Sequence, residues 1–249
     1  MHVILAWFGA ESGGPPSEMP LALALGLLGP CIILGVLGVL VCEYRKATLG
    51  HGIAKTFTAA TFLAVAVHGQ VWSAPYGAWL LLGLCLGFLG DVFLIGKSQR
   101  ALLFGLGSFL LGHLAYLGGF FTLGIDWTNA GIAAAVLVMV GVPVARFMLP
   151  HAPEELRRPV IAYQLAISSM VAAAWGVAGV AGGQGLFLAI AATVFYISDL
   201  SVGLERFVSD RFIHRVWGIP LYFSAQYTTA LPTVAMIHDV DLFKLVIGG

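Results

Sequence analysis

Charged side chains are scarce in this sequence. Only 10% of the 249 residues are Asp, Glu, Lys or Arg, whereas a soluble domain carries about a quarter. The twelve basic residues are balanced by twelve acidic ones. A net charge of zero provides no electrostatic attraction for a nucleic acid backbone. We therefore expect neither a soluble domain nor a nucleic-acid-binding protein.

Cysteine and clustered histidine are also scarce. Cys31, Cys42 and Cys85 lie in apolar runs without CxxC spacing, so we interpret them as small hydrophobic residues rather than as disulfide or metal partners. Of seven histidines, only His68 and His113 fall within apolar runs, whereas a zinc hydrolase needs about three converging ligands. No GxSxG elbow is present for a serine nucleophile. The sequence predicts no metal site and no cofactor.

Apolar residues, by contrast, make up 59% of the chain. They fall in blocks of about twenty residues, the length that crosses the ~30 Å hydrocarbon core of a bilayer. We therefore predict an all-α, polytopic membrane protein, a bundle of eight transmembrane helices in the lipid bilayer (the inner membrane, if the source is bacterial). The predicted spans are about 20–42, 52–72, 76–96, 100–123, 128–149, 158–181, 184–205 and 216–237.

Basic residues are distributed unevenly between the connections. Eleven of the twelve lie in or beside the first, third, fifth and seventh connections, and only Lys244 follows the last span. Because basic residues accumulate in cytoplasmic loops, we expect those loops in the cytoplasm and both termini on the other side. Residues 1–19, which lack the basic start of a cleavable signal, would form a short external segment. Residues 20–237 would form the transmembrane domain and residues 238–249 an external tail.

Two aspartates lie inside apolar spans, Asp91 in the third and Asp199 in the seventh. An ionisable group at membrane depth is costly unless it has a partner or a function. Asp91 comes six residues before Lys97, and Asp199 comes seven before Arg206. At a rise of ~1.5 Å per residue, both acids lie about 10 Å from the cytoplasmic ends of their helices. We predict that the two carboxyl groups share one level and form the catalytic pair.

Several other polar side chains are expected at or near that level. Tyr163 and Tyr222 fall close to it, Lys55 lies nearer the cytoplasmic surface, and His113 and Gln226 lie deeper. Structural roles remain alternatives: Gln226 as a bond between helices, the tyrosines as interfacial residues, and His113 as a packing residue. The candidate substrate-binding or supporting residues are Lys55, His113, Tyr116, Tyr163, Tyr222 and Gln226.

Three segments resemble a known family. The run LLGLCLGFLGDVFLIGKSQRALLFGLGSFLLGHLAYLGGFF resembles the central signature of the YhhN-like membrane proteins, the lysoplasmalogenase family. ATVFYISDL resembles the second acidic motif of that family, and YFSAQYTTA resembles its last span. The resemblance implies eight spans and hydrolysis of the vinyl ether bond of lysoplasmalogens. The products would be a fatty aldehyde and glycerophospho-ethanolamine or -choline, and the substrate partner a lysophospholipid.

The chemistry of a vinyl ether suits a pair of acids. The bond is cleaved when a proton adds to carbon, which leaves an oxocarbenium cation that water attacks. Two carboxyl groups close together do not both ionise, so one can donate the proton while the other stabilises the cation. Which of Asp91 and Asp199 holds the proton is left open. An intramembrane aspartyl protease, a proton-coupled transporter or a lipid-binding protein could use the same two acids.

Overall fold

The computed structural model describes residues 19–242. The predicted external segments at residues 1–18 and 243–249, with Lys244, lie outside the described residues. Within residues 19–242 the chain is almost entirely helical and contains no strand. α2 (Met19–Leu23) continues through the π-helical turn η1 (Ala24–Leu28) into α3 (Gly29–Tyr44). The other long helices are α4 (Thr48–His68), α5 (Pro75–Phe93), α6 (Gln99–Leu123), α7 (Trp127–Met148), α8 (Glu154–Ala178), α9 (Gly182–Gly203) and α10 (Phe212–Ile237).

The prediction of an all-α, multi-pass membrane protein is confirmed. Eight long helices lie where the eight spans were predicted, with boundaries that differ by a few residues. Among residues 19–242, six of them are long and apolar enough to cross a membrane by length and composition. α4 and α10 are the two that do not meet this measure. They carry more polar side chains, among them Lys55 and Thr58 in α4 and Tyr222 and Gln226 in α10.

Local signals account for several helix boundaries. The side chain of Ser98 accepts a hydrogen bond from the backbone N–H of Ala101 and so caps α6. Asp126 caps α7 in the same way through the N–H groups of Thr128 and Asn129. α6 ends before Gly124, whose φ of 96° is accessible mainly to glycine. Gly124 and Asp126 therefore determine where α6 ends and where α7 begins.

α5 and α6 form a closely packed hairpin because glycines line their contact. A Cβ atom on Gly83 would lie 2.3 Å from the Tyr116 ring, and one on Gly112 would lie 3.3 Å from the carbonyl oxygen of Gly83. Small residues let helices approach closely in lipid, where there is no hydrophobic force between them. This hairpin holds Asp91 and His113 in fixed positions relative to each other.

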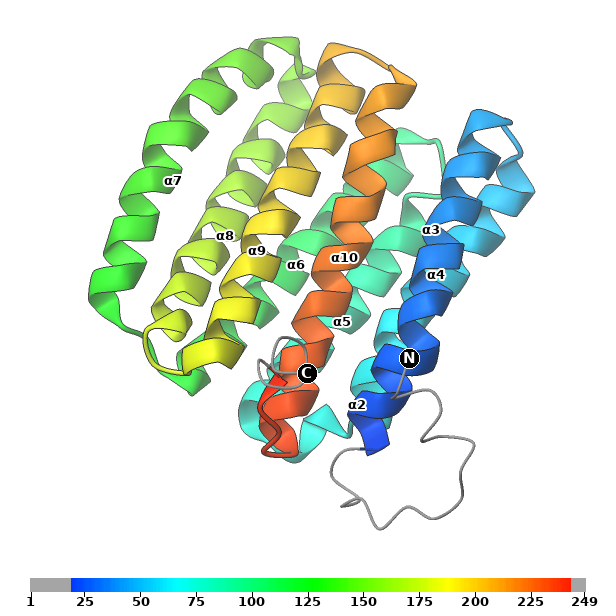
Figure 1. Cartoon of the computed structure of the whole chain (residues 1–249). Coiled ribbons are helices and arrows are strands. Elements are labelled where there is room, and N and C mark those ends of the chain that lie inside the picture. Colours follow the sequence, from blue (N-terminus) through cyan, green and yellow to red (C-terminus); the bar gives the residue numbers. More distant parts are fainter. Residues whose placement is uncertain (1–18, 243–249) are drawn as a thin grey trace.

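The helices run up and down, so that consecutive helices are antiparallel (Figure 1). α10 lies in the middle and packs against α9, α4, α3 and α5. α7 lies at one edge (Figure 1), where its buried residues are only Ala130, Gly141 and Met148. The four connections that carry most of the basic residues are at one end of the bundle, the upper end in Figure 1. Their cytoplasmic location remains a prediction.

The interpretation of the cysteines as unpaired residues agrees with the structure, although their burial is lower than expected. Cys31, Cys42 and Cys85 are all free thiols. Each is half-buried rather than enclosed in the core.

Candidate active site

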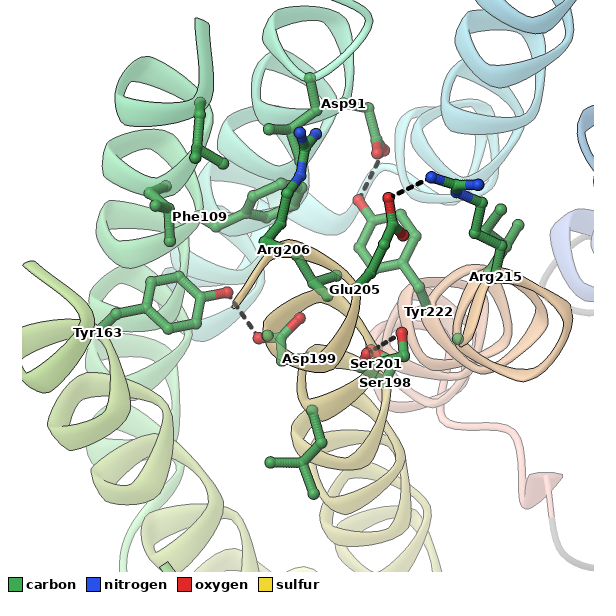
Figure 2. A pocket seen from close by; sticks show the side chains of 18 of the residues that line it. Asp91, Phe109, Tyr163, Ser198, Asp199, Ser201, Glu205, Arg206, Arg215 and Tyr222 are labelled. Atoms are coloured by element: carbon green, nitrogen blue, oxygen red, sulfur yellow. Dashed lines mark hydrogen bonds and ion pairs between the residues drawn. The ribbon is translucent and has the colours of Figure 1, made fainter. Parts of the chain in front are cut away.

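A cavity of about 200 Å³ opens between the helices at the basic end of the bundle. Asp91, in the last turn of α5, and Asp199, near the end of α9, both line it (Figure 2). Its walls also include side chains from α3, α4, α6, α8 and α10. The cavity therefore brings together residues that are far apart in the sequence, among them the two aspartates and also Glu43 and Glu205.

Asp91 is buried and has two polar partners. Only 1% of the residue is exposed. The hydroxyl group of Tyr222 donates a hydrogen bond of 2.6 Å to its Oδ2, and Nζ of Lys55 lies 3.3 Å from its Oδ1. A buried carboxylate is tolerated when a cation and hydrogen bonds replace its water. Lys55 and Tyr222 together provide both.

A chain of hydrogen bonds extends from Asp91 into the bundle. The Tyr116 hydroxyl donates to Oε1 of Gln226 at 2.6 Å, and Nε2 of Gln226 donates to the hydroxyl oxygen of Tyr222 at 3.1 Å. Gly87 leaves room for this chain, since a Cβ atom there would lie 2.3 Å from Nε2 of Gln226. Every donor in the chain points toward Asp91. The buried polar groups of Tyr116 and Gln226 are thereby satisfied, and the Tyr222 hydroxyl is held in place.

Asp199 has a different set of partners. The hydroxyl group of Tyr163 donates a 2.6 Å hydrogen bond to its Oδ2. Nε2 of His113 lies 3.0 Å from the Tyr163 oxygen and 3.6 Å from Oδ2 of Asp199. Because Tyr163 donates its proton to Asp199, its oxygen can accept one from Nε2 of His113, which indicates a proton on Nε2. The Asp199 side chain is 18% exposed, compared with 2% for Asp91, so Asp199 is the more accessible acid.

Aromatic rings connect the surroundings of the two acids. The ring of Phe195 lies 5.3 Å from that of Tyr222 and 4.8 Å from that of His113, measured between centroids. Phe109 lies 5.7 Å from Tyr222 in an edge-on arrangement. Within residues 19–242 no hydrogen bond or ion pair joins Asp91 to Asp199 directly. The two acids thus share a cavity but are held by separate partners.

The structure brings all eight residues singled out from the sequence into these two groups. Lys55, Tyr222, Gln226 and Tyr116 surround or support Asp91. Tyr163 and His113 surround Asp199. His113 and Tyr116, three residues apart on α6, belong to different groups. The catalytic and supporting roles of these residues remain predictions.

Sequence reasoning missed other residues that line the cavity. Phe109 lines the cavity, but its sequence pattern does not distinguish it from a core residue. Phe195 does not line the cavity, but its ring packs against those of His113 and Tyr222. Arg206 and Arg215 were used only as loop charges and as markers of depth, although each lies about two helical turns from Asp199 or Tyr222, which is a usable signal. In the part of the chain that the structure describes, no three His, Cys, Asp or Glu side chains converge as metal ligands do.

A second hollow, an apolar groove of about 710 Å³, lies between α7 and α8 with part of α6. It shares Met148, Val160 and Gln164 with the cavity that holds the acids. The groove extends along α7 from Trp127 to Met148 and on to the neighbouring Leu149. The cavity that holds the acids therefore adjoins an apolar groove at the edge of the bundle.

Comparison with known proteins gives consistent matches. The sequence model of the YhhN family matches residues 50–233. The lysoplasmalogenases of Mycobacterium bovis and Mycobacterium tuberculosis are each 29% identical over 170 residues, which is 65% of this chain and 62% of the relative. Lysoplasmalogenase TMEM86A of Bos taurus is 25% identical over 194 residues, 74% of this chain and 77% of the relative. The match thus spans about three fifths of the mycobacterial relatives. No solved structure matches significantly.

Proposed function

Because this chain belongs to the YhhN family, we propose that it is a lysoplasmalogenase-like hydrolase. Its substrate would be lysoplasmenyl-ethanolamine or -choline, and its products a fatty aldehyde and glycerophospho-ethanolamine or -choline. Relatives that bear the name lysoplasmalogenase support this activity. The observation that carries the proposal is a cavity in a membrane bundle that is lined by two carboxyl groups, each hydrogen-bonded to a tyrosine.

The two acids have surroundings that suit different roles. Burial disfavours a charge on Asp91, and the ammonium of Lys55 and the hydroxyl of Tyr222 oppose this effect by charge attraction and hydrogen bonding. No Lys or Arg within residues 19–242 forms an ion pair with Asp199, which is also the more exposed of the two. We therefore assign the proton donor to Asp199 and the carboxylate that stabilises positive charge to Asp91. Tyr163 and His113 would orient Asp199.

The reaction then follows in balanced steps. Asp199 transfers its proton to the second carbon of the alkenyl chain, and the first carbon becomes an oxocarbenium ion bonded to the glycerol oxygen. Water adds to that first carbon and loses a proton to the Asp199 carboxylate, which is thereby protonated again. The hemiacetal hydroxyl then gives its proton to the glycerol oxygen, the bond between that oxygen and the first carbon breaks, and the aldehyde and the glycerophospho alcohol are released. One water is consumed, and both carboxyl groups return to their initial state.

The apolar groove provides a place for the hydrocarbon tail. The vinyl ether is the first bond of the tail, so it must lie where polar and apolar surroundings meet. Met148, Val160 and Gln164 form such a junction, since they line both hollows. With the vinyl ether at the acids, the alkenyl chain would extend into the groove between α7 and α8.

The test is a hydrolysis assay in detergent with lysoplasmenyl-ethanolamine and a reagent that traps aldehyde. We expect aldehyde with and without a chelator, none from the saturated ether analogue, and one deuterium on the second carbon of the aldehyde when the reaction runs in D₂O. In H₂¹⁸O the glycerophospho product should carry no label, because water attacks the alkenyl carbon. Absence of aldehyde would contradict the proposal, and transport or lipid binding alone would give that result. Loss of aldehyde with chelator, restored by metal, would contradict the two-acid mechanism.

A further inference from the structure

One cation that lines the cavity, the exposed Arg206, has no partner among residues 19–242. Lys55 lies beside Asp91, and the Arg215 guanidinium contacts Glu205 at 2.8 Å, Glu43 at 3.8 Å and also Asp210. Arg206 lines the same cavity. Within residues 19–242, however, its side chain makes no hydrogen bond or ion pair. The cavity thus contains one arginine whose charge no acid of the described part of the chain balances.

The neighbouring residues Glu205 and Arg206 differ in that Glu205 is paired with an arginine, whereas Arg206 is not paired with an acid among the described residues. After α9 the chain makes one π-helical turn, η4 (Leu204–Val208), before the connection to α10. Glu205 is directed toward Arg215 on α10. The next residue, Arg206, remains among the side chains that line the cavity, as Figure 2 shows. The acid nearest in sequence is therefore already engaged and does not neutralise Arg206.

We propose that Arg206 binds the phosphate group of the lysophospholipid substrate. This inference rests on the proposed function. A guanidinium group pairs with phosphate through two parallel hydrogen bonds, a geometry that a lysine ammonium does not provide. An arginine near the end of a transmembrane helix is also at the level of lipid headgroups, where a charge is well solvated.

The order of the sites along the bundle matches the order of groups in the substrate. Arg206 follows Asp199 by seven residues toward the basic end of the bundle. The apolar groove runs from the same cavity toward the other end of α7. A lysoplasmalogen presents phosphate, glycerol, vinyl ether and hydrocarbon tail in that order. Arg206, the two acids and the groove would meet the phosphate, the vinyl ether and the tail respectively.

Binding can be measured without hydrolysis. The ligand is a saturated 1-O-alkyl lysophosphatidylethanolamine, which has no vinyl ether and is not cleaved. We expect Arg206→Gln to raise its Kd about tenfold or more and Arg206→Lys to raise it less, because lysine keeps the charge but not the paired donors. The matched control is Arg211→Gln, an exposed arginine outside the cavity, and it should leave Kd unchanged. An alkylglycerol without phosphate should bind equally to the wild type and to Arg206→Gln.

Two outcomes would overturn the assignment. Unchanged affinity in Arg206→Gln would do so, and so would equal losses in Arg206→Gln and Arg211→Gln, which would indicate general attraction to anionic lipid. In competition, glycerophosphoethanolamine should displace the ligand at lower concentration than inorganic phosphate; equal potency would indicate a site for free phosphate instead. A wild type that binds the alkyl lysolipid but releases no aldehyde from the vinyl ether would refute the hydrolase and leave the phosphate site intact.

Discussion

At the scale of residues, Asp91 and Asp199 are the same side chain in two environments. Asp91 is enclosed and lies between a lysine ammonium and a tyrosine hydroxyl. Asp199 opens to the cavity and is held by a tyrosine that a histidine contacts in turn. Asymmetric surroundings are how two chemically identical acids come to hold a proton and a negative charge at the same pH. This asymmetry leads to two predictions.

The first prediction concerns turnover. Asp91→Asn and Asp199→Asn keep the size of the side chain but remove charge and proton transfer. Each should lower kcat for aldehyde release by at least ~100-fold, the low end for general acid–base catalysis. The double variant should be scarcely worse than either single one, because groups that act as a unit are strongly non-additive. His113→Gln should cause a smaller loss. A folded Asp199→Asn protein with most of its activity would refute the two-acid mechanism.

The second prediction concerns stability. Asp91→Asn leaves the mostly buried ammonium of Lys55 without its counter-charge. Removing one partner of a buried ion pair costs roughly 3–5 kcal/mol of folding stability. We expect its Tm in detergent to fall clearly below that of the wild type, while Asp199→Asn, which loses no Lys or Arg partner, stays close to it. In the double variant Lys55→Met/Asp91→Asn, Tm should recover and activity should not. Recovery of both would mean that Asp91 serves only to balance Lys55.

At the scale of elements, α7 differs from the other helices. It packs at the edge of the bundle (Figure 1), and its contact with α8 leaves the apolar groove that joins the acid-lined cavity. Because α7 has few buried residues, few of its packing contacts with the bundle are lost when a ligand fills the space beside it. The pair α7 and α8 is therefore suited to receive a hydrocarbon chain from the bilayer.

The third prediction tests this groove through tail length. Val138 is exposed on α7 and lines the groove. It is 10 residues from Met148, about 15 Å along the helix. An extended eighteen-carbon chain is long enough to pass this point, whereas an eight-carbon chain is not. Val138→Trp should therefore lower kcat/KM about tenfold for an eighteen-carbon tail and leave an eight-carbon tail unaffected.

Val136 offers the matched control for this measurement. It lies on the same helix, is also exposed and lines neither hollow. Val136→Trp should leave both substrates unaffected. Equal effects of Val138→Trp on long and short tails, or equal effects of the two tryptophans, would argue against a tail in this groove.

At the scale of the whole molecule, the up-and-down order of the helices sorts the connections to two ends. The basic connections share the end that holds the acid-lined cavity. If that end faces the cytoplasm, as the excess of Lys and Arg indicates, the proposed active site would take its substrate from the inner leaflet. Orientation in the membrane would therefore determine which pool of lysolipid the proposed hydrolase can reach.

The fourth prediction tests that orientation. In a background where Cys31, Cys42 and Cys85 are changed to Ala, single cysteines replace Gln99 at the basic end and Ser73 at the opposite end, both exposed. An impermeant maleimide should label Ser73→Cys in intact cells and Gln99→Cys only after permeabilisation. The reverse pattern, or labelling of both in intact cells, would overturn the topology.

The sequence by itself determined the helices and much of the candidate site. Apolar runs of about twenty residues have one favourable backbone state in lipid, since every N–H and C=O must be satisfied within the segment. Depth follows from the helical rise, so counting residues from the basic ends brought Asp91, Asp199, Tyr163 and Tyr222 to one level. Those four residues do line one cavity. The acids were recognisable because a buried charge is energetically costly. Phe109 and Phe195 were not, because a phenylalanine in an apolar helix carries no such cost.

Only the tertiary structure decided which side chains meet. Helix rotation and crossing depend on packing between residues far apart in the chain, such as the glycines of α5 against α6 and the side chains of α10. Depth alone could not tell that Tyr222 joins Asp91 while Tyr163 joins Asp199. Nor could it tell that three carboxylates hold Arg215 while Arg206 has no partner in the described part of the chain. Such pairing depends on angular position around the helix axis, which counting residues from the basic ends does not resolve.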